Sequence, residues 1–357
     1  MVGSSGPRVT MQDVATHAGV SHQTVSNVLN GRASRVSDAT RERVVASISA
    51  LDYRMNQSAR SLRRGRTGTV GLALPSFDSE YYGAFAEALM VRFADRGIRL
   101  VAEHTGGIVS AEISALASSL LDAYDGFVLA LAAGDAEHLD RIEAAKPIVL
   151  VGERALANRF DHLLMDNVGG ARRATEHLLQ RGARRIVVLG GAAAEEESMP
   201  GLRTRGHLEA LSAAGIDPDP ALILPSGFTQ AAGCDGLRSL LARDHRFDAV
   251  FAVTDAAALG ALRALADAGL RAPDDVQVVG FDNIAAAAHS TPRLTTVDPN
   301  NAARADSVVE LMMARLDGDS APLERQVVMH PAALVEREST LSRQQIEPGR
   351  RRGGPGA

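Results

Sequence analysis

The sequence contains a single cysteine, Cys234, among its 357 residues. One cysteine excludes an internal disulfide framework, which fits a reducing compartment. The first residues hold no hydrophobic signal core, and no apolar run approaches the ~20 residues of a membrane-spanning helix. We therefore expect a cytoplasmic protein that does not associate with membranes.

The sequence also lacks the motifs of common enzyme chemistries. It has no G-x-x-x-x-G-K-[ST] phosphate loop, no G-x-S-x-G nucleophile elbow, no C-x-x-C pair and no histidine spacing typical of a metal site. Gly190 and Gly191 follow an expected strand, but the rest of the dinucleotide fingerprint is missing. We expect neither catalytic residues nor a cofactor nor a metal.

Charge is divided unevenly along the chain. The net charge is −5, but residues 1–66 hold ten arginines and four acidic residues, a local charge of +6. The remaining 28 basic and 39 acidic residues carry −11. A basic terminus is often a solvated tail, but here core-type apolar residues are interleaved with the charges. This division predicts a small head that attracts phosphates and a larger acidic body.

Residues 10–30, TMQDVATHAGVSHQTVSNVLN, have the pattern of a DNA-binding helix-turn-helix. Ala15 supplies a small residue where two helices cross, Gly19 accepts positive φ in the turn, and Val25 faces the first helix. Ser21 stands where an N-cap belongs. An ordinary αα-hairpin is the plain alternative. The remaining apolar residues at helical spacing are Val14, Ala18, Val20, Val28 and Leu29.

A third helix and a basic segment are expected next. Residues 38–51 repeat apolar positions at helical spacing and should close the head. Residues 56–68, NQSARSLRRGRTG, are polar and basic, with Leu62 as their only large apolar side chain. Any helix within this segment would have about nine residues, fewer than the ~12–15 of a marginally stable isolated helix. The segment is therefore either a disordered linker or a segment that becomes helical on DNA.

From residue 69 onward, apolar strands alternate with amphipathic helices. Continuous apolar strands separated by helices indicate parallel sheets covered on both faces, here in two similar α/β subdomains. Strands are expected at 69–75, 99–103, 126–131, 148–152, 162–165, 185–190, 221–225, 249–254 and 276–281, with crossing segments at 295–299 and 325–339. Helices are expected at 81–95, 110–122, 170–181, 203–214, 256–268 and 302–317.

These patterns set the expected domains. The helix-turn-helix head is expected at 8–55, a basic linker at 56–68, an α/β core at 69–341, and a disordered Gly/Pro/Arg-rich tail at 342–357. Within the core we expect an N-lobe of about 69–165 and 295–325, and a C-lobe of about 166–294 and 326–341.

Polar and aromatic side chains follow several expected strands. In open parallel sheets, ligands bind at the carboxyl ends of strands. Rings can stack on apolar faces of a ligand, while carboxylates and arginine pair with its hydroxyl groups. A sugar is the first candidate and a nucleobase or nucleoside the second, although an aspartate at a strand end can equally be a helix cap. The predicted effector residues are Phe77, Tyr81, Glu153, Asp166, Arg203, Phe228, Thr254, Asp255 and Asp282.

Together these segments resemble the lactose/galactose-repressor (LacI/GalR) family of bacterial transcription regulators. The resemblance runs from about residue 10 to 341. It includes VTMQDVATHAGVSHQTVSNVLNG, VSDATRERV, the hinge NQSARSLRRGRTGTVGL, DN-x-x-G, R-x-x-G, ALGALRAL, VVGFDN and LTTV. The family implies an α/β fold: an N-terminal all-α helix-turn-helix head plus a two-lobed core of parallel sheets like that of periplasmic binding proteins.

The resemblance also implies which residues contact DNA. His22, Gln23 and Asn27 would read bases in the major groove, because Gln can pair adenine bidentately and Asn or His can bond groove edges. Thr24, Ser26 and Asn30 would lie nearer phosphates, and Ser21 is also expected to contact DNA. In the hinge, which begins at Asn56, Ala59 and Arg60 would enter the minor groove and Leu62 would lever between base pairs.

Four positions depart from the family pattern. Asn27 stands where arginine is frequent, Met55 replaces the proline before the hinge, His207 replaces an aromatic residue, and Thr254 replaces asparagine. The first change predicts a different operator base. The last two prevent transfer of the effector's identity.

The family further implies a homodimer that binds a pseudo-palindromic double-stranded operator. A small-molecule effector between the lobes would control that binding allosterically. Whether the effector induces or co-represses stays open. The alternative is a sugar- or nucleoside-binding solute receptor without a regulatory role, which should carry an export signal and no basic head.

Overall fold

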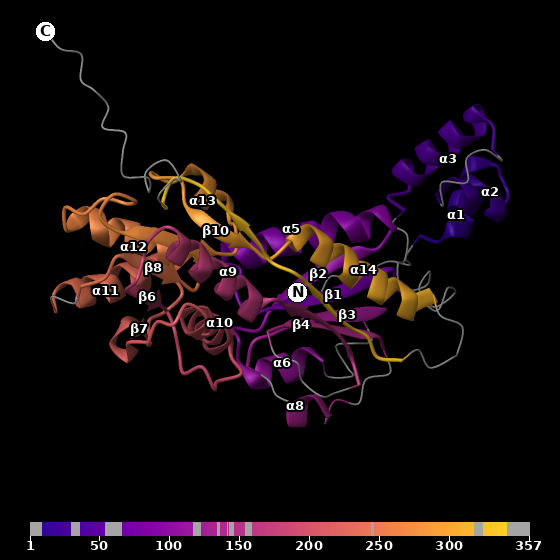
Figure 1. The fold of residues 1–357 in the computed structure, drawn as a ribbon. Helices are drawn as coiled ribbons and strands as arrows, with labels where there is room; N and C mark the ends of the chain where they lie inside the picture. The colour runs from indigo at the N-terminus through magenta and orange to yellow at the C-terminus, as the bar shows by residue number, and fades with distance from the viewer. Residues whose placement is uncertain are drawn as a thin grey trace, which may run out of the picture. The chain divides into compact units, whose positions relative to one another are not determined.

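The computed structural model describes residues 9–29, 36–53, 66–116, 123–133, 136–140, 142, 146–153, 159–243, 246–317 and 324–340. The chain divides into two compact units, Met1–Thr67 and Gly68–Ala357. The expected hinge residues 56–65 and the expected tail 342–357 lie outside the described residues. Figure 1 shows the elements of both units along the chain.

Within its described residues, the first unit contains three helices, as the sequence predicts. They are α1 (Met11–Ala18), α2 (His22–Leu29) and α3 (Asp38–Ala50). Thr10 and Asp13 form a capping box at the start of α1, and Gly19 ends it with a left-handed φ of 60°. The Ser21 hydroxyl accepts the Thr24 amide at 3.1 Å, so the predicted cap of α2 is confirmed.

A small apolar core joins the three helices. Val25 of α2 is 0% exposed and packs with residues of α1 and with Val44 of α3. Because the inward face of α2 is anchored by this valine, its polar residues are left on the other faces. The buried core is Val14, Ala15, Ala18, Val25 and Val44.

The second unit contains two six-stranded sheets, each with helices on both faces (Figure 1). We call the sheet of order β11-β5-β4-β3-β1-β2 with its helices lobe 1, and the sheet of order β12-β10-β9-β8-β6-β7 with its helices lobe 2. The strand pairs are parallel, except that β12 is antiparallel to β10. The parallel two-sheet prediction is therefore confirmed.

The strands lie close to their predicted positions. Those of lobe 1 are β1 (Thr69–Leu74), β2 (Arg99–His104), β3 (Gly126–Leu131), β4 (Ile148–Gly152), β5 (Asp161–Met165) and β11 (Val327–His330). Those of lobe 2 are β6 (Ile186–Leu189), β7 (Ile223–Leu224), β8 (Ala249–Ala252), β9 (Gln277–Phe281), β10 (Thr295–Asp298) and β12 (Ala333–Val335).

The helices cover both faces of each sheet, and a short 3₁₀ turn, η2 (Pro220–Leu222), precedes β7. In lobe 1 they are α5 (Glu80–Asp95), α6 (Val109–Ala115), α8 (Ala136–Asp140) and α14 (Asn301–Asp317). In lobe 2 they are α9 (Asn167–Gln180), α10 (Met199–Ala213), α11 (Gln230–Leu241), α12 (Asp255–Asp267) and α13 (Ala285–His289).

The chain crosses between the lobes at other points than the sequence suggests. We expected residues 295–325 in the N-lobe, but β10 pairs with β9 and belongs to lobe 2. We expected residues from 326 onward in the C-lobe, but β11 pairs with β5 and belongs to lobe 1. An apolar strand pattern shows that a strand is buried, and it does not show which of two similar sheets accepts it.

Gly206 allows α9 and α10 to pack closely. A Cβ at this position would lie 2.2 Å from the Val168 carbonyl oxygen, whereas one at Gly83 of α5 would have nothing within 4 Å. We expect Gly206→Ala to lower the free energy of unfolding by about 1–3 kcal/mol. The control Gly83→Ala should raise it by up to about 1 kcal/mol. Urea unfolding midpoints measure both, and equal midpoints for the two variants would contradict the packing argument.

Candidate functional site

Helix α2 presents a row of polar side chains. Gln23 donates from Nε2 to Asn27 Oδ1 at 3.2 Å, which places these two predicted base readers on one face, one turn apart. Ser21 and Gln23 are exposed, and His22 and Asn27 are half-buried. The remaining predicted phosphate contacts on α2 are Thr24 and Ser26; Asn30, Asn56, Ala59, Arg60 and Leu62 lie outside the described residues.

Arg203 of α10 lies at the centre of a polar cluster in lobe 2, where lobe 2 meets lobe 1. Its side chain is only 2% exposed. Nε donates to Asn167 Oδ1 at 2.8 Å, Nη1 donates to the Val253 carbonyl, and the guanidinium lies 3.5 Å from the centre of the Phe281 ring. These contacts hold a buried cation at the carboxyl ends of the lobe 2 strands.

Asp282 provides the carboxyl group that faces this guanidinium. It follows β9 directly, with a positive φ of 117°, and its Oδ1 lies 3.6 Å from Arg203 Nη1. Burial raises the pKa of Asp282 to about 8; the nearby carboxylates of Asp255 and Glu153 add to this rise, and the charge of Arg203 opposes it. The sequence predicts that a strand-end aspartate and Arg203 lie close together, and Asp282 and Arg203 do so here.

Asp255 and Thr254 are engaged inside lobe 2. Asp255 is fully buried, accepts the Ile284 amide at 2.9 Å and accepts the Thr296 hydroxyl. Burial raises its pKa to about 6, while the hydrogen bonds oppose this. Thr254 caps α12 by accepting the Ala257 amide and donates to the Phe228 carbonyl at 3.0 Å. Both residues thus hold the strand ends in place.

Asn167 connects the two lobes and was missed among the predicted site residues. Its Nδ2 donates to Glu153 at the end of β4 in lobe 1, and its Oδ1 accepts from Arg203 in lobe 2. The only sequence signal was its place in the DN-x-x-G motif. A chain of polar contacts therefore runs from a lobe 1 carboxylate to the buried arginine.

Tyr81 lies on α5 of lobe 1 and packs against apolar residues of lobe 2. Its hydroxyl accepts from Arg304 Nη1 at 2.7 Å, and burial raises its pKa. Its neighbour Glu80 accepts the Ala286 amide of α13 at 3.1 Å, which adds a second polar contact between the lobes. The lobes are therefore in direct contact in this structure.

Other predicted effector residues occupy different surroundings. Asp166 caps α9 through the Gly169 amide at 3.0 Å and binds Arg173 and the Ala332 amide, so its oxygens are engaged in structural contacts. Phe77 is 56% exposed and lies 5.8 Å from the His104 ring, and Phe228 is 44% exposed. Neither ring has a ring or cation–π contact with the Arg203 cluster among the described residues.

The high pKa of Asp282 makes the protein's stability depend on pH. The folded protein keeps this proton to about pH 8, whereas an ordinary aspartate loses it near 3.8. The native state therefore binds more protons in this window, and stability falls as pH rises through it. From about pH 5 to about pH 8, the wild type should lose several kcal/mol of unfolding free energy relative to Asp282→Asn. Urea unfolding at both pH values measures this, and parallel pH profiles would contradict it.

No helix within the described residues is both long and apolar enough to cross a bilayer. The same part of the chain contains no cluster of three or more His, Cys, Asp or Glu residues suited to a metal ion.

A helix-turn-helix unit followed by a two-lobed core of parallel sheets defines the class of DNA-binding regulators with a periplasmic-binding-like domain. Residues 10–56 match the family model for bacterial regulatory proteins of the lacI family. Residues 175–340 match the periplasmic binding protein-like domain. The two matches cover the head and much of the core.

Curated and solved proteins give the same result. The HTH-type transcriptional regulator CelR of Thermobifida fusca is 35% identical over 344 residues, which span 93% of this chain and 98% of CelR. A solved CelR–cellobiose complex is 33% identical with a TM-score of 0.67, covering 93% of this chain and 100% of that one. A lac repressor dimer bound to operator and the anti-inducer ONPF is 27% identical with a TM-score of 0.79, covering 94% and 100%. The chain belongs to the LacI family of bacterial transcription regulators, and the predicted family and fold are confirmed.

Proposed function

We propose that this regulator is a repressor that binds a pseudo-palindromic operator as a homodimer and responds to a sugar bound between lobes 1 and 2. The observation that carries the proposal is the buried Arg203–Asp282 pair, joined through Asn167 to Glu153 of the other lobe. A ligand that binds to this cluster would contact groups of both lobes. Because the operator is DNA, we propose that the protein acts in the cytoplasm.

A sugar suits the chemistry of this cluster. Carboxylates accept hydrogen bonds from hydroxyl groups, and a guanidinium donates to hydroxyl oxygens. In this structure Arg203 and Glu153 bond to protein groups, so a sugar would replace these bonds with its own. The exposed rings of Phe77 and Phe228 remain candidates for stacking on a sugar face. Since the similar CelR structure holds cellobiose, glucose disaccharides are the first ligands to test.

DNA recognition is proposed for the exposed side of α2. His22, Gln23 and Asn27 would read base edges, while Ser21, Thr24, Ser26 and Asn30 would position the helix on phosphates. In the hinge, Asn56, Ala59, Arg60 and Leu62 would contact the minor groove. The net charge of +6 in residues 1–66 supports this assignment.

Control by the effector is proposed to act through lobe closure. The Glu153–Asn167 and Glu80–Ala286 contacts hold the present arrangement of the lobes, and a ligand that changes them changes the closure angle. A helix of about nine residues within the hinge would be marginal alone, so a bias of about 1–3 kcal/mol would be enough to alter operator affinity.

The test is operator binding by fluorescence anisotropy, using a duplex selected from random sequence and a panel of cellobiose, ribose and adenosine. We expect a clear preference for the selected duplex, and a shift in the Kd for that duplex when cellobiose is added. The cellobiose itself should be recovered chemically unchanged after the assay. Sugar binding without any duplex preference would favour the solute-receptor alternative. A response to adenosine alone would overturn the sugar assignment.

The homodimer is proposed to use the outer face of α5. Met90 and Val91 are 41% and 56% exposed there, while the next residue, Arg92, binds Asp306 and holds α5 to α14. The solved lac repressor relative is a dimer. We expect Val91→Asp to give a monomer by sedimentation, because a charge would be buried without a partner. The control Val327→Asp, at a 50% exposed position of β11, should stay dimeric. Identical sedimentation of the two variants would place the interface elsewhere.

A further inference from the structure

Arg304 is a buried cation whose hydrogen-bond partners are uncharged. It lies on the first turn of α14, just after the chain crosses from β10 of lobe 2, and it is 1% exposed. Nη1 donates to the Tyr81 hydroxyl at 2.7 Å and to Asn301 Oδ1 at 3.0 Å, and the guanidinium lies 5.2 Å from the centre of the Phe85 ring. Nε is buried and has no hydrogen-bond partner among the described residues.

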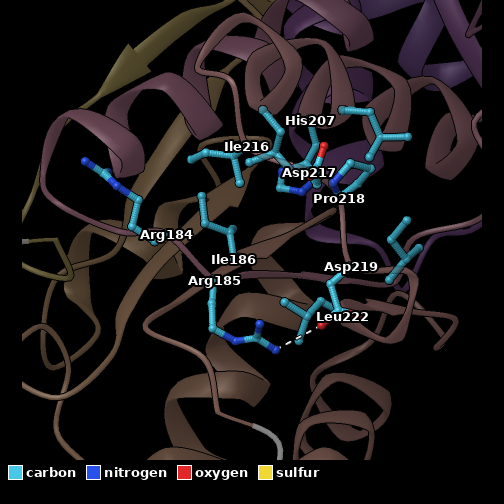
Figure 2. Close-up of a pocket in the computed structure, with 12 residues that line it drawn as sticks. Arg184, Arg185, Ile186, His207, Ile216, Asp217, Pro218, Asp219 and Leu222 are labelled. Carbon is cyan, nitrogen blue, oxygen red and sulfur yellow. Dashed lines mark hydrogen bonds and ion pairs between the residues drawn. The ribbon is translucent and has the colours of Figure 1, made fainter.

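Other arginines of the core have acidic partners. Arg315 donates to both oxygens of the buried Asp161 carboxylate at 2.7 Å. Arg185, beside a cavity of about 40 Å³ that has room for only a few water molecules, donates to Asp219 at 2.9 Å (Figure 2). Arg304 forms no ion pair with any described residue. A buried cation in this state destabilises the fold unless an anion from elsewhere neutralises it.

Tyr81 connects Arg304 to the proposed sugar site. Its hydroxyl accepts from Arg304, and its side chain packs against apolar residues of lobe 2. Burial raises the pKa of Tyr81; the charge of Arg304 opposes this rise, and the carboxylates of Glu153 and Asp282 add to it. The Tyr81 hydroxyl therefore lies within electrostatic reach of Arg304 and of the cluster between the lobes. A ligand group that displaces this hydroxyl would meet the guanidinium.

The carboxyl groups of that cluster have partners other than Arg304. Glu153 accepts from Asn167, and Asp282 faces Arg203. Neither one forms an ion pair with Arg304. A planar carboxylate can accept from Nε and a terminal nitrogen of one guanidinium at the same time, which is the strongest pairing that arginine makes. The unpartnered Nε thus suits a carboxylate supplied by a ligand.

We propose that Arg304 binds the carboxylate of an acidic sugar in the site between the lobes. This rests on the proposed function and specifies its ligand class: sugars that carry one carboxylate beside their hydroxyl groups. The hydroxyl groups would bind to the Arg203 cluster, and the carboxylate would replace the Tyr81 hydroxyl on Arg304. A neutral sugar such as cellobiose would bind in the same site without this ion pair, and so more weakly.

The test compares each sugar with its own acid by calorimetry, using the full chain at about neutral pH. The pairs are cellobiose with cellobionate and glucose with glucuronate. In at least one pair the acid should bind about tenfold or more tightly, because a charge-assisted hydrogen bond is about twice as strong as a neutral one. Equal affinity within both pairs, or no binding of any of the four sugars, would overturn the proposal.

Three variants test the role of the guanidinium. Arg304→Met keeps the length of the side chain and removes its charge, so the two members of each pair should bind alike. Arg304→Lys keeps the charge without the planar fork and should retain part of the preference. The control Arg263→Met, at an exposed position of α12, should retain all of it. A preference that survives in Arg304→Met would assign the carboxylate to another residue.

Stability without ligand separates a ligand-binding arginine from a structural one. Arg304→Met removes a buried charge that has no acidic partner, so the urea midpoint should stay the same or rise. Arg315→Met should lower the midpoint, because the buried Asp161 loses its cation. A fall for Arg304→Met as large as that for Arg315→Met would make Arg304 a structural residue and contradict the proposal.

These outcomes are distinguishable from failure of the proposed repressor function. If cellobiose shifts operator affinity but no acid is preferred, only the role of Arg304 is wrong. If no sugar binds while the preference for the selected duplex persists, the sugar site between the lobes is wrong as well.

Discussion

Arg203→Ala should abolish the effect of cellobiose on operator affinity while leaving operator affinity itself nearly unchanged. Arg203 supplies the buried cation of the proposed sugar site, and charge-assisted hydrogen bonds contribute about 1.5–3 kcal/mol each. Losing two of them weakens sugar binding by about a hundredfold or more. Operator anisotropy titrated with cellobiose measures the response. A separate operator titration without sugar measures the basal affinity.

The matched control is Arg205→Ala on the same helix. Arg205 binds Glu197 and the Ala194 carbonyl in the segment just before α10, so its loss should leave the response intact. Asp282→Asn provides a second variant that keeps the shape of the site. An unchanged sugar response in both Arg203→Ala and Asp282→Asn would show that the effector binds elsewhere.

Gln23→Ala should weaken operator binding strongly and leave sugar binding unchanged. A bidentate side-chain contact to a base contributes about 1–3 kcal/mol, and a dimer loses it at both half-sites, so we expect about 30-fold to 10⁴-fold weaker binding. The affinity for random duplex should change little, because phosphate contacts carry no sequence information. Anisotropy with selected and random duplexes separates the two effects.

Gln12→Ala is the control for this prediction. Gln12 is exposed on α1, outside the proposed reading face, so the same change of residue type should cost less than about 1 kcal/mol in operator affinity. Equal losses for Gln12→Ala and Gln23→Ala would contradict the assignment of α2 as the reading helix.

The fold was largely predictable because its signals are local. The Ala15, Gly19 and Val25 constraints reproduce the helix-turn-helix, and fully buried apolar strands such as β1 and β3 reproduce the parallel sheets. The prediction failed for long-range strand pairing. The placement of β10 and β11 depends on which sheet offers an open edge, and two similar sheets give no sequence signal for that choice.

The sequence predicted which residues lie at the strand ends, but it did not predict which contacts their side chains make. Arg203 and Asp282 converge because both lie at the carboxyl ends of one sheet. By contrast, the capping roles of Asp166 and Thr254 and the bridging role of Asn167 depend on rotamers and neighbours. The sequence links His207 to the effector's identity only because it replaces an aromatic residue, and in the structure its ring binds Thr175, because α9 and α10 approach closely at Gly206.

The most direct test of the account is the ratio of Kd values for selected and random duplexes, measured at moderate salt with and without cellobiose. The account predicts a preference for the selected duplex that changes by about tenfold when the sugar is added, which corresponds to a coupling free energy of about 1.4 kcal/mol. Equal affinity for both duplexes, with and without the sugar, would contradict it.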